Sequence, residues 1–280
     1  MDNFCIIVNK DRDEQLELAR QVQDFLEEKG KKYCTYVESL NTGETVFSEI
    51  SDSVECAIVL GGDGTLIRAS KRLLKREIPL FGINAGTLGY LACVEATEAQ
   101  KGLEALCNGD YRIESRMMLQ AEVNGQYEDT VLNEVAINRS GVCRLISLAV
   151  YVNGALLDVI AGDGLLISTP TGSTGYNLSA GGAIVKPETK LIMITPICPH
   201  SLTSRGVIVS AEDEILIEVK QGNRTQEVEA LATFDGRTAK NLKAGDKVLI
   251  RCSSYTTKMI RLEEGTFFEV LRSKLGSVER

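Results

Sequence analysis

The feature that most constrains the fold is a change of hydrophobic pattern near residue 115. Before that point, short apolar runs such as Phe4–Val8 and Val54–Leu60 alternate with amphipathic segments such as Glu14–Lys29. This alternation of strands and helices predicts a parallel sheet with helices on both faces. Within it we expect a helix over Thr97–Asn108, with Thr97 as its N-cap.

After residue 115 the chain consists of short period-two or apolar runs separated by turn pairs. The pairs Asn124–Gly125, Asn153–Gly154 and Asp163–Gly164 are each typical of a two-residue hairpin. This half therefore predicts an antiparallel β domain. We expect an α/β domain over residues 1–115, a β-rich domain over 116–255, and a mildly amphipathic tail over 256–280 that packs on another part of the chain.

Composition disfavours several function classes. The 31 basic and 39 acidic residues give a net charge of -8, which disfavours a nucleic-acid partner, and 5% aromatic residues without Trp disfavour a base-stacking platform. No apolar run approaches a membrane span and the N-terminus does not have the pattern of a signal peptide, so we expect a cytoplasmic protein without a membrane partner. The eight Cys form no CxxC pair and His200 is the one histidine, so no zinc site built on His and paired Cys is expected.

A glycine turn stands where a buried strand is expected to give way to a helix, in LGGDGTLIRAS at Leu60–Ser70. Glycines without a Cβ let the backbone approach a bulky anion, and the helix N-terminus offers free N–H groups to it. The spacing matches neither the Walker A loop nor GxGxxG. Asp63 within this turn has three interpretations: a cap on the helix, a metal ligand between phosphates, or a base that takes a proton from an attacking hydroxyl.

The uncharged segment STPTGSTGYNLSAGG at Ser168–Gly182 could be a flexible linker or a surface that binds a polar ligand through hydroxyls and backbone. Its Pro, Tyr and Leu disfavour a linker. The pair Asn133–Glu134 stands at an expected strand start, where the two side chains would face opposite ways unless a bulge intervenes.

Taken together, these motifs resemble those of the NAD kinase family. They are GGDG at Gly61–Gly64, GINAGTLGYL at Gly82–Leu91, NE at Asn133–Glu134, GDGLLISTPTGSTGYNLSAGG at Gly162–Gly182, ITPICPHSL at Ile194–Leu202 and FDG at Phe234–Gly236, in the family's order. The GGDG turn is shared with lipid kinases of the diacylglycerol and sphingosine type, which leaves a lipid kinase as one alternative. A non-catalytic dinucleotide sensor is the other, although Asp63 is intact.

The resemblance implies an α/β N-terminal domain, a mostly antiparallel β C-terminal domain, and a nucleotide site in the cleft between them. It also implies a tail that returns to the first domain and a homodimer or homotetramer. The implied reaction transfers the γ-phosphate of ATP to the 2′-hydroxyl of the adenosine ribose of NAD and makes NADP. Mg²⁺ would be held mainly through the phosphates.

The resemblance also implies roles for individual residues. Asp63 would be the general base on the 2′-hydroxyl, Gly62, Gly64 and Thr65 would lie along the phosphates, and Asn84 would belong to the same nucleotide site. Asn133 and Thr171 would bond the adenine of NAD, and Glu134 and Thr174 the nicotinamide ribose. Asp163 and Gly175 would contact the carboxamide end, and Tyr176 would pack over the ligand. Ser179 and Asp235 would line the site.

Overall fold

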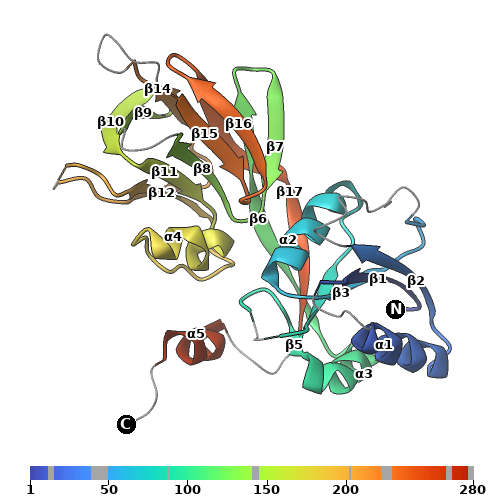
Figure 1. The fold of residues 1–280 in the computed structure, drawn as a ribbon. Helices are drawn as coiled ribbons and strands as arrows, with labels where there is room; N and C mark the ends of the chain where they lie inside the picture. The colour runs from blue at the N-terminus through green and yellow to red at the C-terminus, as the bar shows by residue number, and fades with distance from the viewer. Residues whose placement is uncertain are drawn as a thin grey trace. The chain divides into compact units, whose positions relative to one another are not determined.

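The computed structural model describes residues 1–11, 16–38, 50–86, 89–140, 145–201, 203–221, 229–262 and 267–276. The chain forms two compact units (Figure 1): unit 1 comprises residues 1–115 and 257–280, and unit 2 comprises residues 116–256. Two strands, β6 (Arg112–Val123) and β17 (Lys247–Arg261), continue from one unit into the other.

Unit 1 is built on a parallel sheet. Strand β1 lies between β2 and β3, β4 follows β3, and Met259 of β17 pairs with Leu80 of β4. Strand β3 is buried along its whole length, as expected for a strand covered on both faces. The strands are β1 (Asn3–Asn9), β2 (Lys32–Glu38), β3 (Cys56–Leu60), β4 (Leu80–Asn84) and β5 (Val94–Glu95).

The helices of unit 1 follow the apolar periodicity of the sequence. Helix α1 buries Leu18, Val22 and Leu26 in the same core as β1 and β3, and Gly30 with φ 66° follows its end. The helices are α1 (Glu17–Glu28), α2 (Asp63–Arg72), η1 (Leu74–Arg76), η2 (Ala96–Glu98), α3 (Ala99–Asn108) and α5 (Phe267–Leu275).

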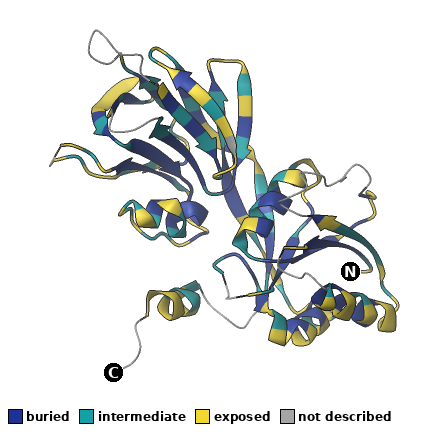
Figure 2. Ribbon diagram, in the orientation of Figure 1, coloured by how far each residue is buried: buried dark blue, intermediate teal, exposed yellow. Residues whose placement is uncertain are grey.

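Two sequence-based expectations concern the start of α3 and the packing of α5. The predicted N-cap at Thr97 is wrong: Thr97 lies inside the short 3₁₀ helix η2, and α3 begins two residues later without a side-chain cap. The residue in the extended N-cap conformation is Glu95, which precedes η2, and the 3₁₀ turn then leads directly into α3. Helix α5 in the tail has no buried residue (Figure 2), and its packing on the first unit stays a prediction.

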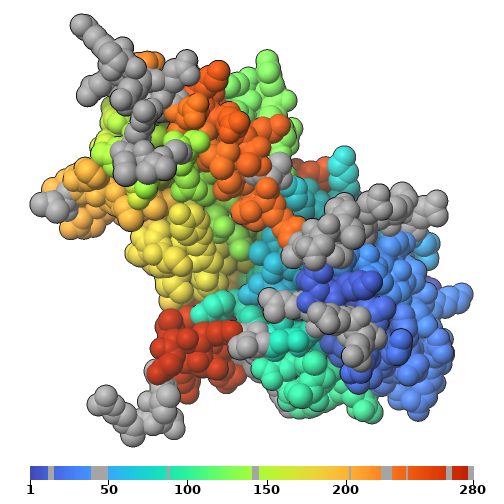
Figure 3. All heavy atoms as spheres, viewed as in Figure 1, coloured from blue at the N-terminus to red at the C-terminus, as the bar shows by residue number. Residues whose placement is uncertain are grey.

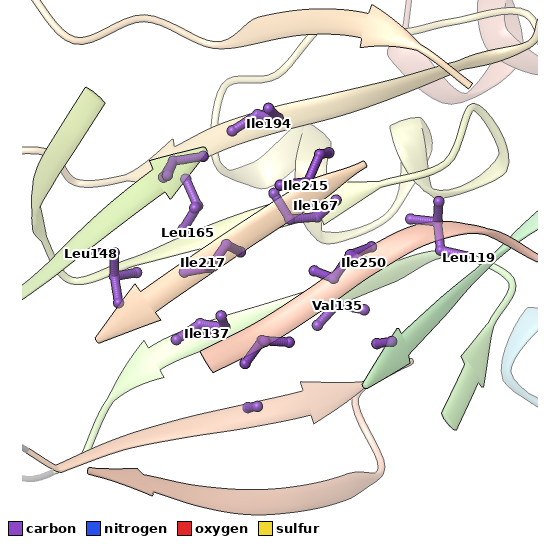
Figure 4. Packing of buried hydrophobic residues seen from close by; sticks show 14 of the residues in the cluster. Leu119, Val135, Ile137, Leu148, Leu165, Ile167, Ile194, Ile215, Ile217 and Ile250 are labelled. Atoms are coloured by element: carbon purple, nitrogen blue, oxygen red, sulfur yellow. The ribbon is translucent and has the colours of Figure 1, made fainter. Parts of the chain in front are cut away.

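Unit 2 contains two mostly antiparallel sheets around one apolar core. One sheet has the order β10-β9-β14-β17, with β6 paired to β7, and the other has the order β13-β12-β11-β8-β15-β16. Ile215 and Ile217 of the first meet Ile137 and Ile167 of the second in the core (Figure 4). The other strands are β7 (Tyr127–Val131), β8 (Glu134–Arg139), β9 (Ile146–Val152), β10 (Ala155–Gly162), β11 (Gly164–Ser168), β12 (Leu191–Ile197), β13 (Val207–Ser210), β14 (Ile215–Val219), β15 (Glu229–Phe234) and β16 (Thr238–Lys243).

Turn chemistry explains two of the three predicted hairpins. Asn124–Gly125 and Asn153–Gly154 have positive φ at both residues, and they join β6 to β7 and β9 to β10. The hairpin predicted at Asp163–Gly164 is wrong, because β10 pairs with β9 whereas β11 pairs with β8 and β12. The chain changes sheets at Asp163, and Gly164 fits tightly: a Cβ there would lie 2.4 Å from the carbonyl oxygen of Ile137.

The predicted fold class, an α/β unit with a parallel sheet and a mostly antiparallel β unit, is confirmed. None of the helices in the described part of the chain combines the length and apolar character needed to cross a bilayer.

Candidate active site

In unit 1, the turn between β3 and α2 places backbone and one carboxylate at the carboxyl edge of the parallel sheet. Gly61 is buried, and a Cβ at this position would lie 2.5 Å from Thr65 Oγ1, so the turn accepts no side chain there. Gly62 precedes α2 and Gly64 is exposed in its first turn. The free amides of a helix N-terminus at such an edge suit a phosphate.

Asp63 is the first residue of α2, but it does not cap the helix. Its carboxylate accepts hydrogen bonds from two backbone amides of a distant segment, Tyr90 N to Oδ2 at 2.8 Å and Leu91 N to Oδ1 at 3.1 Å. The N-cap position is Gly62, and no side-chain bond is made there, so the capping interpretation is wrong. A Cβ on Gly89 would lie 1.9 Å from Asp63 Oδ1. The side chain is therefore held in one orientation by the segment 89–91.

Asn84, at the end of β4, lies beside this turn. It is 3% exposed, its Oδ1 would be 3.8 Å from a Cβ on Gly62, and its Nδ2 finds no hydrogen-bond partner in the described chain. A buried amide without a partner is unusual in a folded protein. It can donate to an anionic ligand placed over the glycine turn.

The hydroxyl group of Thr65 makes hydrogen bonds within unit 1. It is buried, and its Oγ1 accepts hydrogen bonds from Asn9 Nδ2 at 3.0 Å and Arg68 Nη2 at 3.1 Å. The Arg68 guanidinium also donates to the buried Glu38, from Nε to Oε1 at 2.6 Å. Thr65 thus ties the first turn of α2 to β1, and Arg68 ties the same helix to β2. Sequence reasoning missed Asn9, Arg68 and Glu38, because no local motif links three residues so far apart.

In unit 2, the predicted residues gather where β8, β11 and β15 meet. Asp235 follows β15 with φ 50°, and its carboxylate accepts hydrogen bonds from the backbone amides of three consecutive residues, Leu132, Asn133 and Glu134, at 2.8–3.1 Å. These three hydrogen bonds hold Asn133 just before β8, outside the regular strand. The alternation that would separate Asn133 from Glu134 therefore does not apply, and both side chains lie within 3.5 Å of the position of a Cβ on Gly175.

Four polar atoms in this region are buried and find no hydrogen-bond partner in the described chain. They are Asn133 Oδ1, Glu134 Oε2, Ser168 Oγ and Thr171 Oγ1. Glu134 and Ser168 are register partners on β8 and β11, and Thr169 N donates to the carbonyl of Asn133 at 2.8 Å. Because buried polar groups are normally paired, four such atoms together indicate a polar ligand site. Ser168 was missed in the sequence, although it begins the uncharged segment.

The rest of the uncharged segment is folded onto these strands. Ser168, Thr169, Ser173 and Asn177 have no exposed surface, and the Asn177 side chain bonds the carbonyl oxygen of Ala183 and the hydroxyl of Thr195. The linker interpretation is therefore wrong. Helix α4 (Tyr176–Ser179) lies at the surface of unit 2, in yellow in Figure 3.

The remaining predicted residues lie around this site with fewer ties. Asp163 Oδ1 accepts a hydrogen bond from Arg139 Nε at 2.7 Å, and the exposed Tyr176 places its hydroxyl 3.5 Å from Asn138 Oδ1. Thr174 Oγ1 is 3.4 Å from the carbonyl oxygen of Thr171. Ser179 is exposed at the end of α4. Arg139 and Asn138 were missed, although they end the same strand that Glu134 begins.

The side chain of Glu134 has a raised pKa in the folded protein. Burial, followed by the negative charge of Asp235, raises the pKa of Glu134 from 4.5 to about 7. Near neutral pH the side chain thus exists both as an acid that donates a hydrogen bond and as a carboxylate that accepts them.

This pKa predicts a pH dependence of stability. Glu134 loses its proton near pH 4.5 in the unfolded chain but keeps it to about pH 7 in the folded chain. Its protonation therefore adds to the free energy of unfolding in full below pH 4.5, and this contribution is lost as the pH rises to 7. The difference corresponds to on the order of 3 kcal/mol. In urea unfolding between pH 4.5 and 7.5, we expect Glu134→Gln to lack this decline. Parallel curves for the two proteins would show that Glu134 has an ordinary pKa.

A glycine turn before a helix suits a phosphate, and buried, unpartnered hydrogen-bonding groups in a β unit suit a polar ligand, so the two features fit the class of nucleotide-binding proteins. Two solved structures share the fold. The match to the structure of yeast NADH kinase with NADH spans all of this chain and 89% of the yeast chain, with a TM-score of 0.83 and 21% identity. The match to the structure of an NAD kinase from Archaeoglobus fulgidus with ATP spans 99% of this chain and 100% of that chain, with a TM-score of 0.76 and 24% identity.

Sequence comparison identifies the family. Residues 4–111 match the ATP-NAD kinase N-terminal domain and residues 132–262 the ATP-NAD kinase C-terminal domain. The NAD kinase of Lachnoclostridium phytofermentans is 46% identical over 99% of both chains, and that of Lachnospira eligens is 38% identical over 98% of this chain and 100% of its own. The chain belongs to the ATP-NAD kinase family, and it is a phosphotransferase with an alcohol acceptor. The lipid-kinase alternative finds no support.

Proposed function

We propose that this protein transfers the γ-phosphate of ATP to the 2′-hydroxyl of the adenosine ribose of NAD and so makes NADP. Family membership and the full-length relatives support the reaction. The observation that carries the residue assignment is the Asp63 carboxylate, fixed by two backbone amides beside a glycine turn. Phosphoryl transfer requires positioning and charge stabilisation more than covalent chemistry, and rigid backbone contacts supply positioning.

In unit 1 we assign the proton-accepting step to Asp63. Each of its carboxylate oxygens accepts one backbone hydrogen bond and keeps a further lone pair, which can take the proton from the ribose hydroxyl. Gly62, Gly64 and the unpartnered amide of Asn84 would contact phosphate oxygens. The contact implied for Thr65 is limited to its hydroxyl proton, since its oxygen already accepts two hydrogen bonds.

In unit 2 the unpartnered atoms support the assigned NAD contacts. Asn133 Oδ1 can accept from the adenine amino group, with Thr171 as the second adenine contact, and Glu134 with Thr174 can bond the nicotinamide ribose. Asp163 and Gly175 would meet the carboxamide end, and Tyr176 and Ser179 the outer face. For Asp235 we propose a supporting role, because its carboxylate holds the backbone that presents Asn133 and Glu134.

Mg²⁺ would enter as part of the substrate, as the magnesium complex of ATP. The described residues contain no group of three or more His, Cys, Asp or Glu side chains placed to hold a metal ion. Magnesium prefers phosphate and water oxygens, so the ATP phosphates would supply its ligands. We place the enzyme in the cytoplasm, where both nucleotides are available.

We further propose that the protein is a homodimer or homotetramer. Strand β10 ends its sheet, and Leu156, Leu157 and Val159 on it are exposed (Figure 2). An apolar edge strand with unpaired backbone groups is a natural contact for a second chain. Light scattering on the purified protein tests this, and a monomeric mass at micromolar concentration would contradict it.

The function is tested by incubating the protein with NAD, ATP and Mg²⁺ and detecting NADP with an NADP-specific dehydrogenase. We expect NADP only when all three are present, and none when EDTA removes the metal. NAD binding without any ATP-dependent product would overturn the proposal in favour of a non-catalytic sensor. Replacing NAD by diacylglycerol is the control for acceptor class, and no lipid phosphate is expected.

A further inference from the structure

Arg261, the last residue of β17, holds the segment that in turn holds Asp63. Its guanidinium donates hydrogen bonds to three consecutive carbonyl oxygens in unit 1: Nη1 to Leu91 and Ala92, both at 2.8 Å, and Nη2 to Tyr90 at 3.2 Å. All four residues belong to unit 1. A planar guanidinium with several fixed donors can satisfy such a set of acceptors, and a lysine ammonium cannot match its geometry.

An acidic partner keeps the guanidinium in place. Arg261 Nε lies 3.5 Å from Glu114 Oε2, and both side chains are about nine-tenths buried, with 12% and 10% exposed. Glu114 Oε1 is also 2.9 Å from Arg112 Nη2. Because few water molecules reach it, this charge pair is screened less than a surface pair, and it restrains Arg261 through Nε while the carbonyl oxygens accept from Nη1 and Nη2.

One peptide group, between Tyr90 and Leu91, bonds both Arg261 and Asp63. The carbonyl of Tyr90 and the N–H of Leu91 belong to one planar trans peptide, whose two ends point in opposite directions. Arg261 donates to the carbonyl end and the N–H end donates to Asp63 Oδ1. A cation at the carbonyl polarises the peptide and strengthens its N–H as a donor. Displacing Arg261 would therefore weaken the hydrogen bond from the Leu91 N–H to the Asp63 carboxylate.

We propose that Arg261 is a positioning residue for Asp63, acting through the backbone of residues 90–92. The inference rests on the proposed role of Asp63 as the general base. Arg261 does not meet substrate in this arrangement, because its guanidinium is occupied by carbonyls and by Glu114. Its contribution is to keep the carboxylate in the orientation that the turnover step requires.

The test is Arg261→Lys, with kcat and both KM values measured beside wild type. We expect kcat to fall about 10- to 100-fold, on the scale of a displacement of about 1 Å at a catalytic group, with KM for NAD and ATP little changed. In an Asp63→Asn background the same substitution should cost no further activity, since the group that it positions is absent. The matched control is Lys258→Met on the same strand, which removes an exposed ion pair to Glu77 and should keep full kcat.

The outcomes separate the two proposals. Full kcat in Arg261→Lys together with a collapsed Asp63→Asn would overturn the role of Arg261 and leave the reaction intact. Equal losses from Arg261→Lys in both backgrounds would show a merely structural residue. Normal turnover in Asp63→Asn would instead remove the base itself. Should Arg261→Lys fail to fold, Glu114→Gln carries the test, with a smaller loss of kcat in the same direction expected and unchanged kcat contradicting the inference.

Discussion

Asp63→Asn is expected to lower kcat by about 100- to 10,000-fold, the usual contribution of general-base catalysis. The substitution keeps the size of the side chain but removes its ability to accept a proton. The unpartnered atoms of Asn133, Glu134, Ser168 and Thr171 are untouched, so the Kd for NAD should remain within a few-fold of wild type. Steady-state kinetics and calorimetric titration with NAD measure the two effects separately.

The same variant should carry a modest stability cost. Two backbone amides, of Tyr90 and Leu91, donate to the carboxylate, and a carboxamide offers one oxygen and one donor group in its place. One N–H would then face an N–H, at about 1–3 kcal/mol. The protein should still unfold cooperatively. Near-normal turnover in a folded Asp63→Asn protein would remove this residue from the mechanism.

The second large effect is expected from Gly89→Ala. The added Cβ would lie 1.9 Å from Asp63 Oδ1, 2.4 Å from its Cγ and 2.6 Å from its Oδ2, so the carboxylate or the backbone of 89–91 must move. Either movement breaks the two hydrogen bonds that orient the base. Because a misplacement of about 1 Å at a catalytic group can cost about 100-fold in rate, we expect a kcat loss of about that size.

A matched control lies three residues earlier in the same motif. Gly86 is exposed, its φ is not positive, and a Cβ there would meet nothing within 4 Å. Gly86→Ala should keep wild-type kcat and could gain about 0.4–1 kcal/mol in the free energy of unfolding through a less flexible unfolded chain. Equal kcat values for the two alanine variants would contradict the tight contact between Gly89 and Asp63.

Local sequence rules predicted much of the fold because they act within a few residues. The apolar face of α1 and the buried run of β3 follow from periodicity, and the Asn-Gly hairpins follow from the ease with which these residues adopt positive φ. Asp163–Gly164 shows the limit of such rules. The pair matches a hairpin by composition, but the strands beside it find their partners elsewhere in unit 2.

The motifs also indicated which residues belong to the candidate site, but not how each is used. Asp63 and Asp235 were both predicted as site residues from short motifs. The structure shows that each accepts hydrogen bonds from backbone amides, 27–28 residues away for Asp63 and 101–103 residues away for Asp235. The contact of Thr65 with the phosphates stays a prediction, and the structure adds that its hydroxyl oxygen accepts hydrogen bonds from Asn9 and Arg68.

The sequence alone determined the family, the fold class and the location of the glycine turn, since these depend on residue types at short spacings. Only the tertiary structure decided that Asp63 is held by the segment 89–91, that Ser168 joins the unpartnered cluster, and that Arg261 braces the backbone behind the carboxylate. The physical reason is that every residue except proline has a backbone N–H and every residue has a carbonyl. The residue types in a sequence therefore do not reveal which backbone groups a side chain such as Asp63 or Arg261 bonds.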